Sequence, residues 1–383
     1  MSNDEATLRV DDHPAALAPE AWNALLASAD APTPFMRHEY LQALHDSGSA
    51  VADTGWRAQF ASVWRGDELL AACPAYLKSH SYGEYVFDWA WADAYRRHGL
   101  DYYPKLLVAV PFTPVPGSRL LARDAPSRAL LMRGLELLAE RLELSSAHLL
   151  FGDAADRAAA GEQGWLARSG VQFHWQNAGW AGFEDFLASL QRDKRKKIQQ
   201  EQRRVREAGI EFEVRQGAQI TEADWDFFYR CYQLTYRAHH STPYLTRDFF
   251  RRMASTMAAH WLLFIAKRGQ TRIAASLIAL DPERGQAYGR YWGAVEPVPC
   301  LHFDACYYQP LAWCIAKGYA RFEGGAQGEH KMARGLLPVE THSSHWLAHP
   351  DFSDAVADFL AREGQAMRGY IDELDEHRPF KRP

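Results

Sequence analysis

This sequence lacks the features that mark exported, membrane-spanning and zinc-binding proteins. Its five cysteines include no CxxC pair, which argues against both a disulfide framework and a structural zinc site. No apolar run approaches the ~20 residues that a membrane-spanning helix needs. The N-terminus is acidic where a signal peptide is first basic and then apolar. We therefore expect a cytoplasmic protein with reduced cysteines and no membrane span.

An excess of positive charge is also missing. The chain carries 43 Lys and Arg against 48 Asp and Glu, a net charge of −5, so any contact with a polyanion must be local. What is present is ample material for hydrophobic cores, because 47% of the 383 residues are apolar and 13% are aromatic. At ~150 residues per domain, this length predicts two units.

The first half of the chain reads as strands, a loop, a helix and a further strand. Residues alternate between apolar and polar in strand fashion over 56–76, around a turn at 65–67. The elements expected next are a strand over 103–111, a loop over 114–119, an amphipathic helix over 126–144 and a buried strand over 147–151.

The second half repeats this order. The segments RGDELLAACPAYL (65–77) and RGQTRIAASLIAL (268–280) share an RG turn, a pair of alanines and a final leucine at a constant offset. Strand, helix and strand patterns follow over 286–292, 303–317 and 320–322. This order predicts an internal duplication, with lobes over residues 1–177 and 178–383.

Three segments carry a resemblance to a known family. They are KSHSYGEYVFDWAWADAYRRHGLDYYPKL (78–106), the basic stretch within 183–213, and YWGAVEPVPCLHFDACYYQPLAWCIAKGYARFEGGAQGEHKMARG (291–335). Together they resemble the FemAB-like predicted N-acyltransferases of the GNAT superfamily. The resemblance implies an α/β (α+β) fold of two GNAT-like lobes, each a mixed, mostly antiparallel sheet flanked by helices. It also implies transfer of an acyl group to an amine.

The expected cosubstrate is acyl-CoA, whose pyrophosphate is held in GNAT enzymes by N–H groups at the start of a helix. In the first lobe Gly117 permits close approach, Ser118 can donate a hydrogen bond and Arg119 can pair with phosphate. The second lobe offers two prolines, which lack N–H groups, and Glu296, which repels phosphate. We therefore expect acyl-CoA at the first lobe; the alternative is that 115–119 is a simple turn.

A Gly-rich charged segment after the last predicted strand is the expected catalytic region. By resemblance, Lys331 matches the Fem-type lysine that serves the transferred acyl group, so we assign it to oxyanion stabilisation, with Glu329 or His330 as the base. The expected substrate contacts here are Glu323, Gln327 and Arg334. The alternative is a solvent-facing polar loop.

An aromatic-rich insertion over residues 78–105 is a second candidate. Its aromatic side chains can desolvate Glu84 or Asp88 and raise the pKa toward neutrality, as acid–base catalysis requires. Spacing alone would allow a helix, but Gly83 and the neighbouring aromatics favour a loop or strand over 84–88. The expected substrate contacts are His80, Tyr82, Trp89 and Trp91. The alternative is an aromatic satellite core with solvated acids.

A basic run over residues 192–206 has two interpretations. Its cations can bind the phosphates of tRNA or a nucleotide, with Lys194, Arg195, Lys197 and Arg203 as the contacts. Alternatively it is a solvated helix that connects the lobes, which we prefer because the charges surround a thin apolar seam.

Three functions remain open. The preferred one is an acyl-CoA-dependent N-acyltransferase acting on a small-molecule or peptide amine. The others are a Fem-like aminoacyl-tRNA-dependent transferase and a non-catalytic module that binds a cell-wall precursor. We expect no tightly bound cofactor and no metal ion, because His342 and His345 face opposite sides of a predicted strand.

Overall fold

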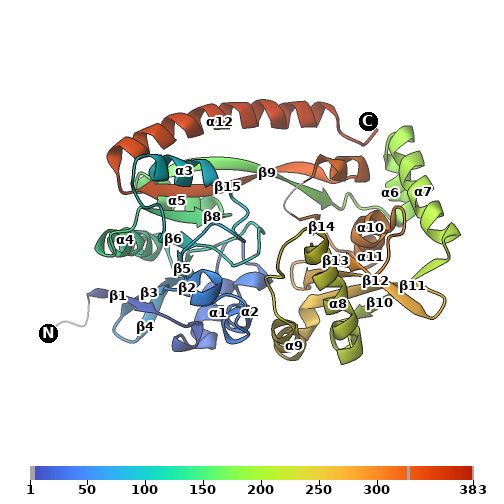
Figure 1. The fold of residues 1–383 in the computed structure, drawn as a ribbon, viewed down its shortest axis with the longest axis horizontal. Coiled ribbons are helices and arrows are strands. Elements are labelled where there is room, and N and C mark those ends of the chain that lie inside the picture. Colours follow the sequence, from blue (N-terminus) through green and yellow to red (C-terminus); the bar gives the residue numbers. More distant parts are fainter. Residues whose placement is uncertain (1–4, 326–327, 382–383) are drawn as a thin grey trace. The chain divides into compact units, whose positions relative to one another are not determined.

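The computed structural model describes residues 5–325 and 328–381, which fold as two compact units (Figure 1). Unit 1 extends to Gly170 and also includes Glu340–Gly369, whereas unit 2 comprises Val171–Val339 and the segment from Tyr370 onward. The predicted contiguous lobes, divided at residue 177, differ from this arrangement because the chain returns to unit 1 after completing most of unit 2.

Unit 1 follows the predicted order of elements. Its members are β1 (Ala6–Asp11), α1 (Pro19–Ala27), α2 (His38–Asp46), β2 (Trp56–Ala58), β3 (Phe60–Arg65), β4 (Glu68–Cys73), β5 (Ala75–Lys78), α3 (Trp89–Arg97), β6 (Lys105–Val108), β7 (Leu121–Ala122), α4 (Ala125–Arg141), β8 (Ser146–Leu150) and α5 (Ala154–Glu162). One sheet has the order β1-β3-β4-β7. Another contains β8-β6-β5-β2, and buried side chains of α4 and α5 share a core with strands of both sheets.

Unit 2 contains one sheet between two groups of helices. Its members are α6 (Phe183–Ser189), α7 (Arg192–Glu207), β10 (Ile210–Gln216), α8 (Glu222–Ala238), α9 (Arg247–Thr256), β11 (Trp261–Arg268), β12 (Thr271–Asp281), β13 (Gln286–Ala294), α10 (Leu301–Phe303), a π-helical turn (Asp304–Tyr308), α11 (Gln309–Ala316), β14 (Arg321–Glu323) and the 3-10 helix η7 (Glu329–Arg334). The strand order is β10-β11-β12-β13-β14-β9. Helices α6, α7 and α11 cover one face, and α8 packs on the other (Figure 1).

The internal duplication is confirmed by strand register. The β3–β4 hairpin is irregular between Val63 and Trp64, and the β11–β12 hairpin is irregular at the matching place, between Ala266 and Lys267. The turns begin with glycines at φ 59° and 58°, the left-handed conformation that glycine adopts without strain. The two RG segments therefore form the same bulged hairpin.

A proline explains the main difference between the two copies. Strand β12 runs unbroken over Thr271–Asp281, whereas its counterpart is divided into β4 and β5 at Pro74. Proline has no N–H to donate and does not fit the interior of a central strand. The first copy consequently splits its strands between two sheets, and the second keeps them in one.

Each unit is completed by a strand from the other half of the sequence. Strand β9 (Leu166–Gln176) follows the first copy but pairs with β14 of unit 2, placing His174 opposite Glu323. Strand β15 (Leu337–Leu347) follows the second copy but pairs with β8 of unit 1, placing His345 opposite His148. This exchange is the reason that a single boundary near residue 177 does not describe the units.

The long helix α12 (Pro350–Glu376) closes the chain after β15. Within residues 5–325 and 328–381, no helix is both long and apolar enough to cross a membrane. The insertion at 78–105 contains helix α3, which starts only at Trp89, so Glu84 and Asp88 precede it as predicted.

Candidate functional site

A fork between two parallel strands of unit 2 forms the candidate site. Strands β13 and β14 pair only where Gln286–Tyr288 faces Arg321–Glu323. Beyond this point β13 continues to Ala294, while the chain leaves β14 at Gly324. Among the described residues, the remainder of β13 has no strand partner on the β14 side.

Both strands place a glycine at the point where they separate. A Cβ on Gly289 would lie 3.3 Å from the carbonyl oxygen of Glu323, and a Cβ on Gly324 would lie 2.5 Å from Leu336 and 3.1 Å from Lys331. Side chains are therefore excluded at this point, which leaves a small pocket of about 130 Å³. Besides both glycines it is lined by Ser276, Ile278, Arg290, Tyr291, Trp292, His302, Cys306, Tyr307 and Gly325.

The same position in unit 1 is filled. Val108 pairs with Ala75, and Gly289 pairs with Ile278. Ala75 and Ile278 are equivalent residues of the two copies, because the same number of residues separates them as separates the two RG turns. Val108 faces Leu149 across the parallel β6–β8 pair, and these side chains are 1% and 0% exposed. Because two large side chains stand where unit 2 has two glycines, only the second copy has room for a ligand at this point.

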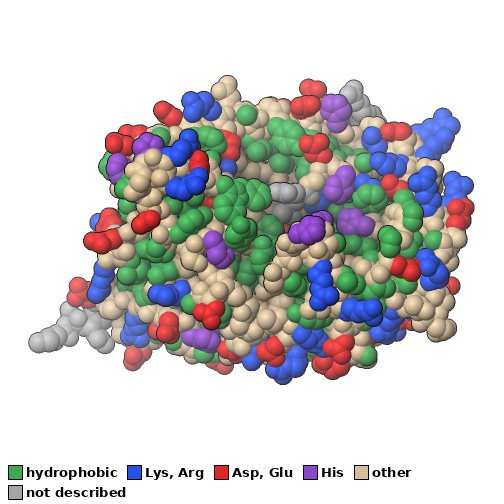
Figure 2. Space-filling model, in the orientation of Figure 1, with side chains coloured by type: hydrophobic (Ala, Val, Ile, Leu, Met, Phe, Trp, Pro, Cys, Tyr) green, Lys and Arg blue, Asp and Glu red, His purple; other side chains and the backbone are tan. Residues whose placement is uncertain are grey.

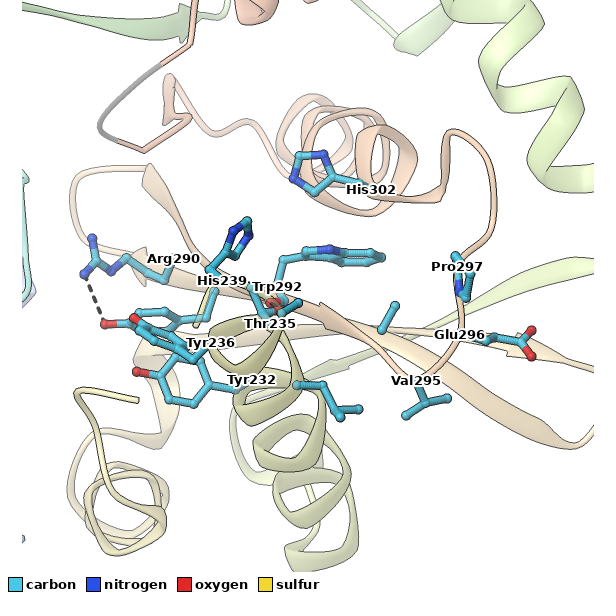
Figure 3. A pocket seen from close by; sticks show the side chains of 14 residues that line it. Tyr232, Thr235, Tyr236, His239, Arg290, Trp292, Val295, Glu296, Pro297 and His302 are labelled. Atoms are coloured by element: carbon cyan, nitrogen blue, oxygen red, sulfur yellow. Dashed lines mark hydrogen bonds between the residues drawn. The ribbon is translucent and has the colours of Figure 1, made fainter. Parts of the chain in front are cut away.

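A larger groove of about 700 Å³ adjoins the pocket and shares with it Arg290, Tyr291, Trp292 and His302. Figure 3 shows the groove following β13 from Arg290 toward Pro297, with side chains of α8 along one side and His302 on the other. Helix α8 can approach β13 closely because residue 293 is glycine; a Cβ there would lie 2.0 Å from the Cys231 carbonyl oxygen. This groove provides a long, aromatic approach to the fork.

Lys331, the lysine that the resemblance indicated, lies beside the fork. Its stem passes Gly324, and its Nζ donates a hydrogen bond of 2.9 Å to the carbonyl of Gly325. The residue is only 3% exposed, so the alternative of a solvent-facing loop does not describe it. Burial lowers the pKa of Lys331 to about 8, which leaves the side chain mostly cationic at neutral pH.

The two candidate bases lie on different sides of the Lys331 turn. His330 Nε2 is 3.3 Å from the hydroxyl of Tyr307, which lines the pocket. Partial burial, together with Arg334 and Lys331, lowers the pKa of His330 below 6.5, so it is neutral at pH 7 and can accept a proton. Glu329 instead accepts a hydrogen bond from Tyr370 in a separate hollow. The geometry therefore favours His330.

Neither Arg334 nor Glu323, both expected as substrate contacts, lines the pocket. Arg334 is 2% exposed and pairs with Glu201 of α7 at 3.0 Å. Glu323 is buried opposite His174 at the base of the fork. Gln327 lies outside the described residues.

Sequence reasoning missed the residues that shape the pocket floor. Ser276 Oγ lies 3.7 Å from Cys306 Sγ, and burial raises the pKa of that thiol to about 12, so it stays neutral. Cys306 and Tyr307 line the pocket from a π-helical turn, a feature that is common at functional sites. No local pattern in this sequence predicts that turn. Gly289, a glycine inside a strand, was the available signal, because such glycines mark close approaches of backbone or ligand.

The predicted pyrophosphate site at Gly117, Ser118 and Arg119 is not available in this structure. The backbone N–H groups of all three residues donate to acceptors elsewhere in unit 1. The Arg119 guanidinium is buried and donates to the carbonyls of Val115 and Gly117. Because the donors are already engaged, this segment is a structural corner, which was the alternative interpretation.

The acids of the insertion gather in unit 1 around a lysine that sequence reasoning missed. Lys105 is fully buried, and its Nζ contacts Asp88 and, at 2.8 Å, Glu84. Burial raises the pKa of Glu84 to about 7, in the direction predicted for an acid–base group. The carboxylates are ion-paired within unit 1, however, and are not solvated surface acids.

The predicted substrate contacts of the insertion also lie in unit 1. Tyr82 and Trp89 are exposed, with ring centroids 5.2 Å apart, and His80 contacts Tyr82. Trp91 is buried against His345, 4.9 Å away. None of these residues lines the pocket at the fork.

The chain contains two copies of one mixed α/β core, and the second copy has an open fork. The chain belongs to the FemAB-like family: residues 14–382 match this family, which is described by peptidoglycan biosynthesis and recognition.

Solved structures share the architecture at low sequence identity. L-PGS from Bacillus licheniformis is 12% identical, with a TM-score of 0.55 over 92% of this chain and 99% of that chain. FemX is 10% identical, with a TM-score of 0.55 over 89% and 98%. The C-terminal domain of a putative lysylphosphatidylglycerol synthetase from Agrobacterium fabrum is 10% identical, with a TM-score of 0.54 over 90% and 95%. No curated protein matches at the sequence level.

Proposed function

We propose that unit 2 transfers an acyl or aminoacyl group from an activated donor to an amine, with the reacting carbonyl in the pocket at the β13–β14 fork. The observation that carries this proposal is the pair of glycines, Gly289 and Gly324, beside the buried ammonium of Lys331. A planar carbonyl group fits between these glycines, where a side chain does not, and the Lys331 ammonium lies close enough to stabilise negative charge on its oxygen.

The proposed reaction needs two groups of this chain. The amine nitrogen attacks the carbonyl carbon, a C–N bond forms, and the carbonyl electron pair moves onto oxygen, where the Lys331 ammonium stabilises it. The amine proton passes to His330, directly or through the Tyr307 hydroxyl 3.3 Å away. Collapse then breaks the C–S bond of a thioester or the C–O bond of an aminoacyl ester, and the leaving group takes up the proton.

Acyl-CoA remains our first candidate donor because a thioester suits the narrow fork. The two segments considered for its pyrophosphate do not favour it, however: the N–H groups of 117–119 are engaged within unit 1, and Glu296 before α10, which pairs with Arg268, repels phosphate. The groove along β13 would therefore have to recognise the donor through its aromatic walls.

Aminoacyl-tRNA is the second candidate donor, and the surface of α7 favours it. At 100° per residue, Arg192, Arg195, Lys196, Arg203 and Arg206 fall within about 100° of one another around the helix axis. Of the contacts expected from the sequence, Arg195 and Arg203 belong to this stripe, whereas Lys194 and Lys197 lie outside it. All residues of the stripe except Arg195, which is half-buried, are exposed, and none of the helix's acids falls within this arc. Figure 2 shows blue side chains gathered at the edge of the molecule where Figure 1 places α7. Such a stripe can follow a phosphate backbone.

Ligand-linked stabilisation tests the proposal and separates the donors. The melting temperature of the whole protein is measured with acetyl-CoA, longer acyl-CoAs and aminoacyl-tRNA. A donor that binds the native state at a hundredfold excess over Kd stabilises it by about 2.7 kcal/mol. Stabilisation by a donor that disappears in Gly289→Val supports the fork. If a donor stabilises the wild type and Gly289→Val equally, the fork is not its site.

A further inference from the structure

A buried ion pair connects the basic helix α7 to the turn that carries Lys331. Glu201 is the one acid that α7 buries among its described residues. Its carboxylate accepts two hydrogen bonds from Arg334 Nη2, at 3.1 and 3.0 Å, and another from the hydroxyl of Tyr308. The Arg334 and Glu201 side chains are 2% and 9% exposed, so this contact is nearly dry.

Arg334 holds three elements at once. Its guanidinium carbon lies 3.6 Å from the ring centroid of Phe303 on α10, a stacked cation–π contact. Its Nη1 donates a 2.6 Å hydrogen bond to the carbonyl of His330, the residue immediately before Lys331. The planar fork of arginine makes such a set of directed contacts possible, and a lysine ammonium cannot reproduce it.

Stability alone is a weak reason for this pair. Desolvating two charges offsets most of their attraction, and a well-packed apolar pair of similar volume is commonly as stable. What a hydrophobic pair would lack is direction: the carboxylate fixes the guanidinium, and the guanidinium fixes the peptide between His330 and Lys331. The pair therefore determines where the Lys331 side chain begins.

Among the described residues, the Lys331 ammonium donates one hydrogen bond, to the Gly325 carbonyl at 2.9 Å. At its other end the turn closes on Gly335, at φ 88°. A turn released from Glu201 would let the ammonium move toward water, away from the glycines of the fork.

We propose that Glu201 and Arg334 are positioning residues that hold the Lys331 ammonium, dehydrated, beside the β13–β14 fork. This proposal rests on the proposed function, because a positioned ammonium serves catalysis only if unit 2 transfers an acyl group. The placement of the ammonium can nevertheless be measured without turnover. Tyr308 supports Glu201 in this role, as the third member of the buried network.

The test is the titration of Lys331 Nζ, followed by its ¹⁵N chemical shift in uniformly labelled protein and assigned with Lys331→Arg. In the wild type the midpoint lies near pH 8, because burial lowers the pKa of this ammonium to about 8. In Arg334→Lys and Glu201→Gln we expect the midpoint to rise by about one pH unit or more toward the ordinary value. Tyr308→Phe should move it in the same direction by less.

Arg272→Gln is the matched control. It removes another arginine of unit 2 whose carboxylate partner, Asp224, is buried, at 2.7 Å, but which takes no part in the Lys331 turn. We expect it to lower the melting temperature and leave the Lys331 midpoint unchanged. Folded Arg334→Lys and Glu201→Gln proteins with the wild-type midpoint would overturn the proposal, as would an equal shift in Arg272→Gln. A shifted midpoint in a protein that transfers no acyl group would refute only the proposed function.

Discussion

Val108 of unit 1 and Gly289 of unit 2 occupy the same position in the two copies of the fold. The valine faces Leu149 and closes the first fork, whereas the glycine, together with Gly324, lines the open second fork. The duplication has thus produced one copy with a packed core and one with a pocket. This difference is the reason that we propose the chemistry for unit 2. The first-lobe donor site expected at Gly117, Ser118 and Arg119 is withdrawn because their N–H groups are engaged within unit 1.

Gly289→Val should close the second fork as Val108 closes the first. A Cβ at residue 289 would meet neighbours at 3.2 and 3.3 Å, so we expect a cost of about 1–3 kcal/mol in unfolding free energy and a loss of donor-linked stabilisation. Thermal melts with and without donor measure both effects. Gly182→Ala is the control, since its added Cβ meets nothing within 4 Å; equal loss of donor binding in both variants would contradict the fork.

Lys331→Met should reduce turnover about 10²- to 10³-fold, because it removes the cation from the developing oxyanion while keeping most of the buried volume. Once a donor and acceptor are found, kcat is measured beside the melting temperature. Near-normal kcat in a folded Lys331→Met protein would remove this residue from the mechanism.

Lys331 should also contribute to the pH dependence of the free energy of unfolding. Burial lowers the pKa of Lys331 from 10.5 to about 8, so between these values the unfolded chain binds more protons than the native one. Native stability contributed by this group therefore rises with pH across that window, by at most about 3 kcal/mol. Denaturant unfolding from pH 7 to 10 should show a steeper rise in the wild type than in Lys331→Met, which keeps only the contribution of other buried groups such as Lys78, whose pKa burial lowers to about 7. Parallel curves for the two proteins would indicate a solvated ammonium.

Lys105→Met should destabilise unit 1 strongly, by about 3–5 kcal/mol, because it leaves Glu84 and Asp88 buried without their cation. Chemical unfolding at pH 7 measures the loss. Lys267→Met, which breaks a more exposed ion pair with Glu213, serves as the comparison and should cost much less. Similar small losses in both variants would mean that the Lys105 cluster is hydrated.

The cationic stripe of α7 predicts the salt dependence of RNA binding. If tRNA binds there, Arg192→Gln with Arg203→Gln should weaken it and reduce the slope of log K against log salt by about two. Lys197→Gln with Arg204→Gln removes the same charge from the other flank of the helix and should have less effect. Binding to tRNA that responds equally to both pairs would point to a diffuse contact.

The sequence by itself determined the local elements and the repeat. Alternation over 56–76, the RG turns and the apolar helix patterns were sufficient, because strand and helix periodicity and turn chemistry are properties of neighbouring residues. The resemblance also led to Lys331, since its place after the last strand of the second copy is visible in order along the chain.

Only the tertiary structure decided how these elements are shared and which of them form a site. The exchange of β9 and β15 depends on strand pairing between residues such as His174 and Glu323, which are far apart in sequence. Burial of Lys331 and Lys105 likewise depends on what packs over them. The open fork required knowing that Gly289 and Gly324 line one pocket, because a cavity exists only where segments distant in sequence leave the same space unfilled.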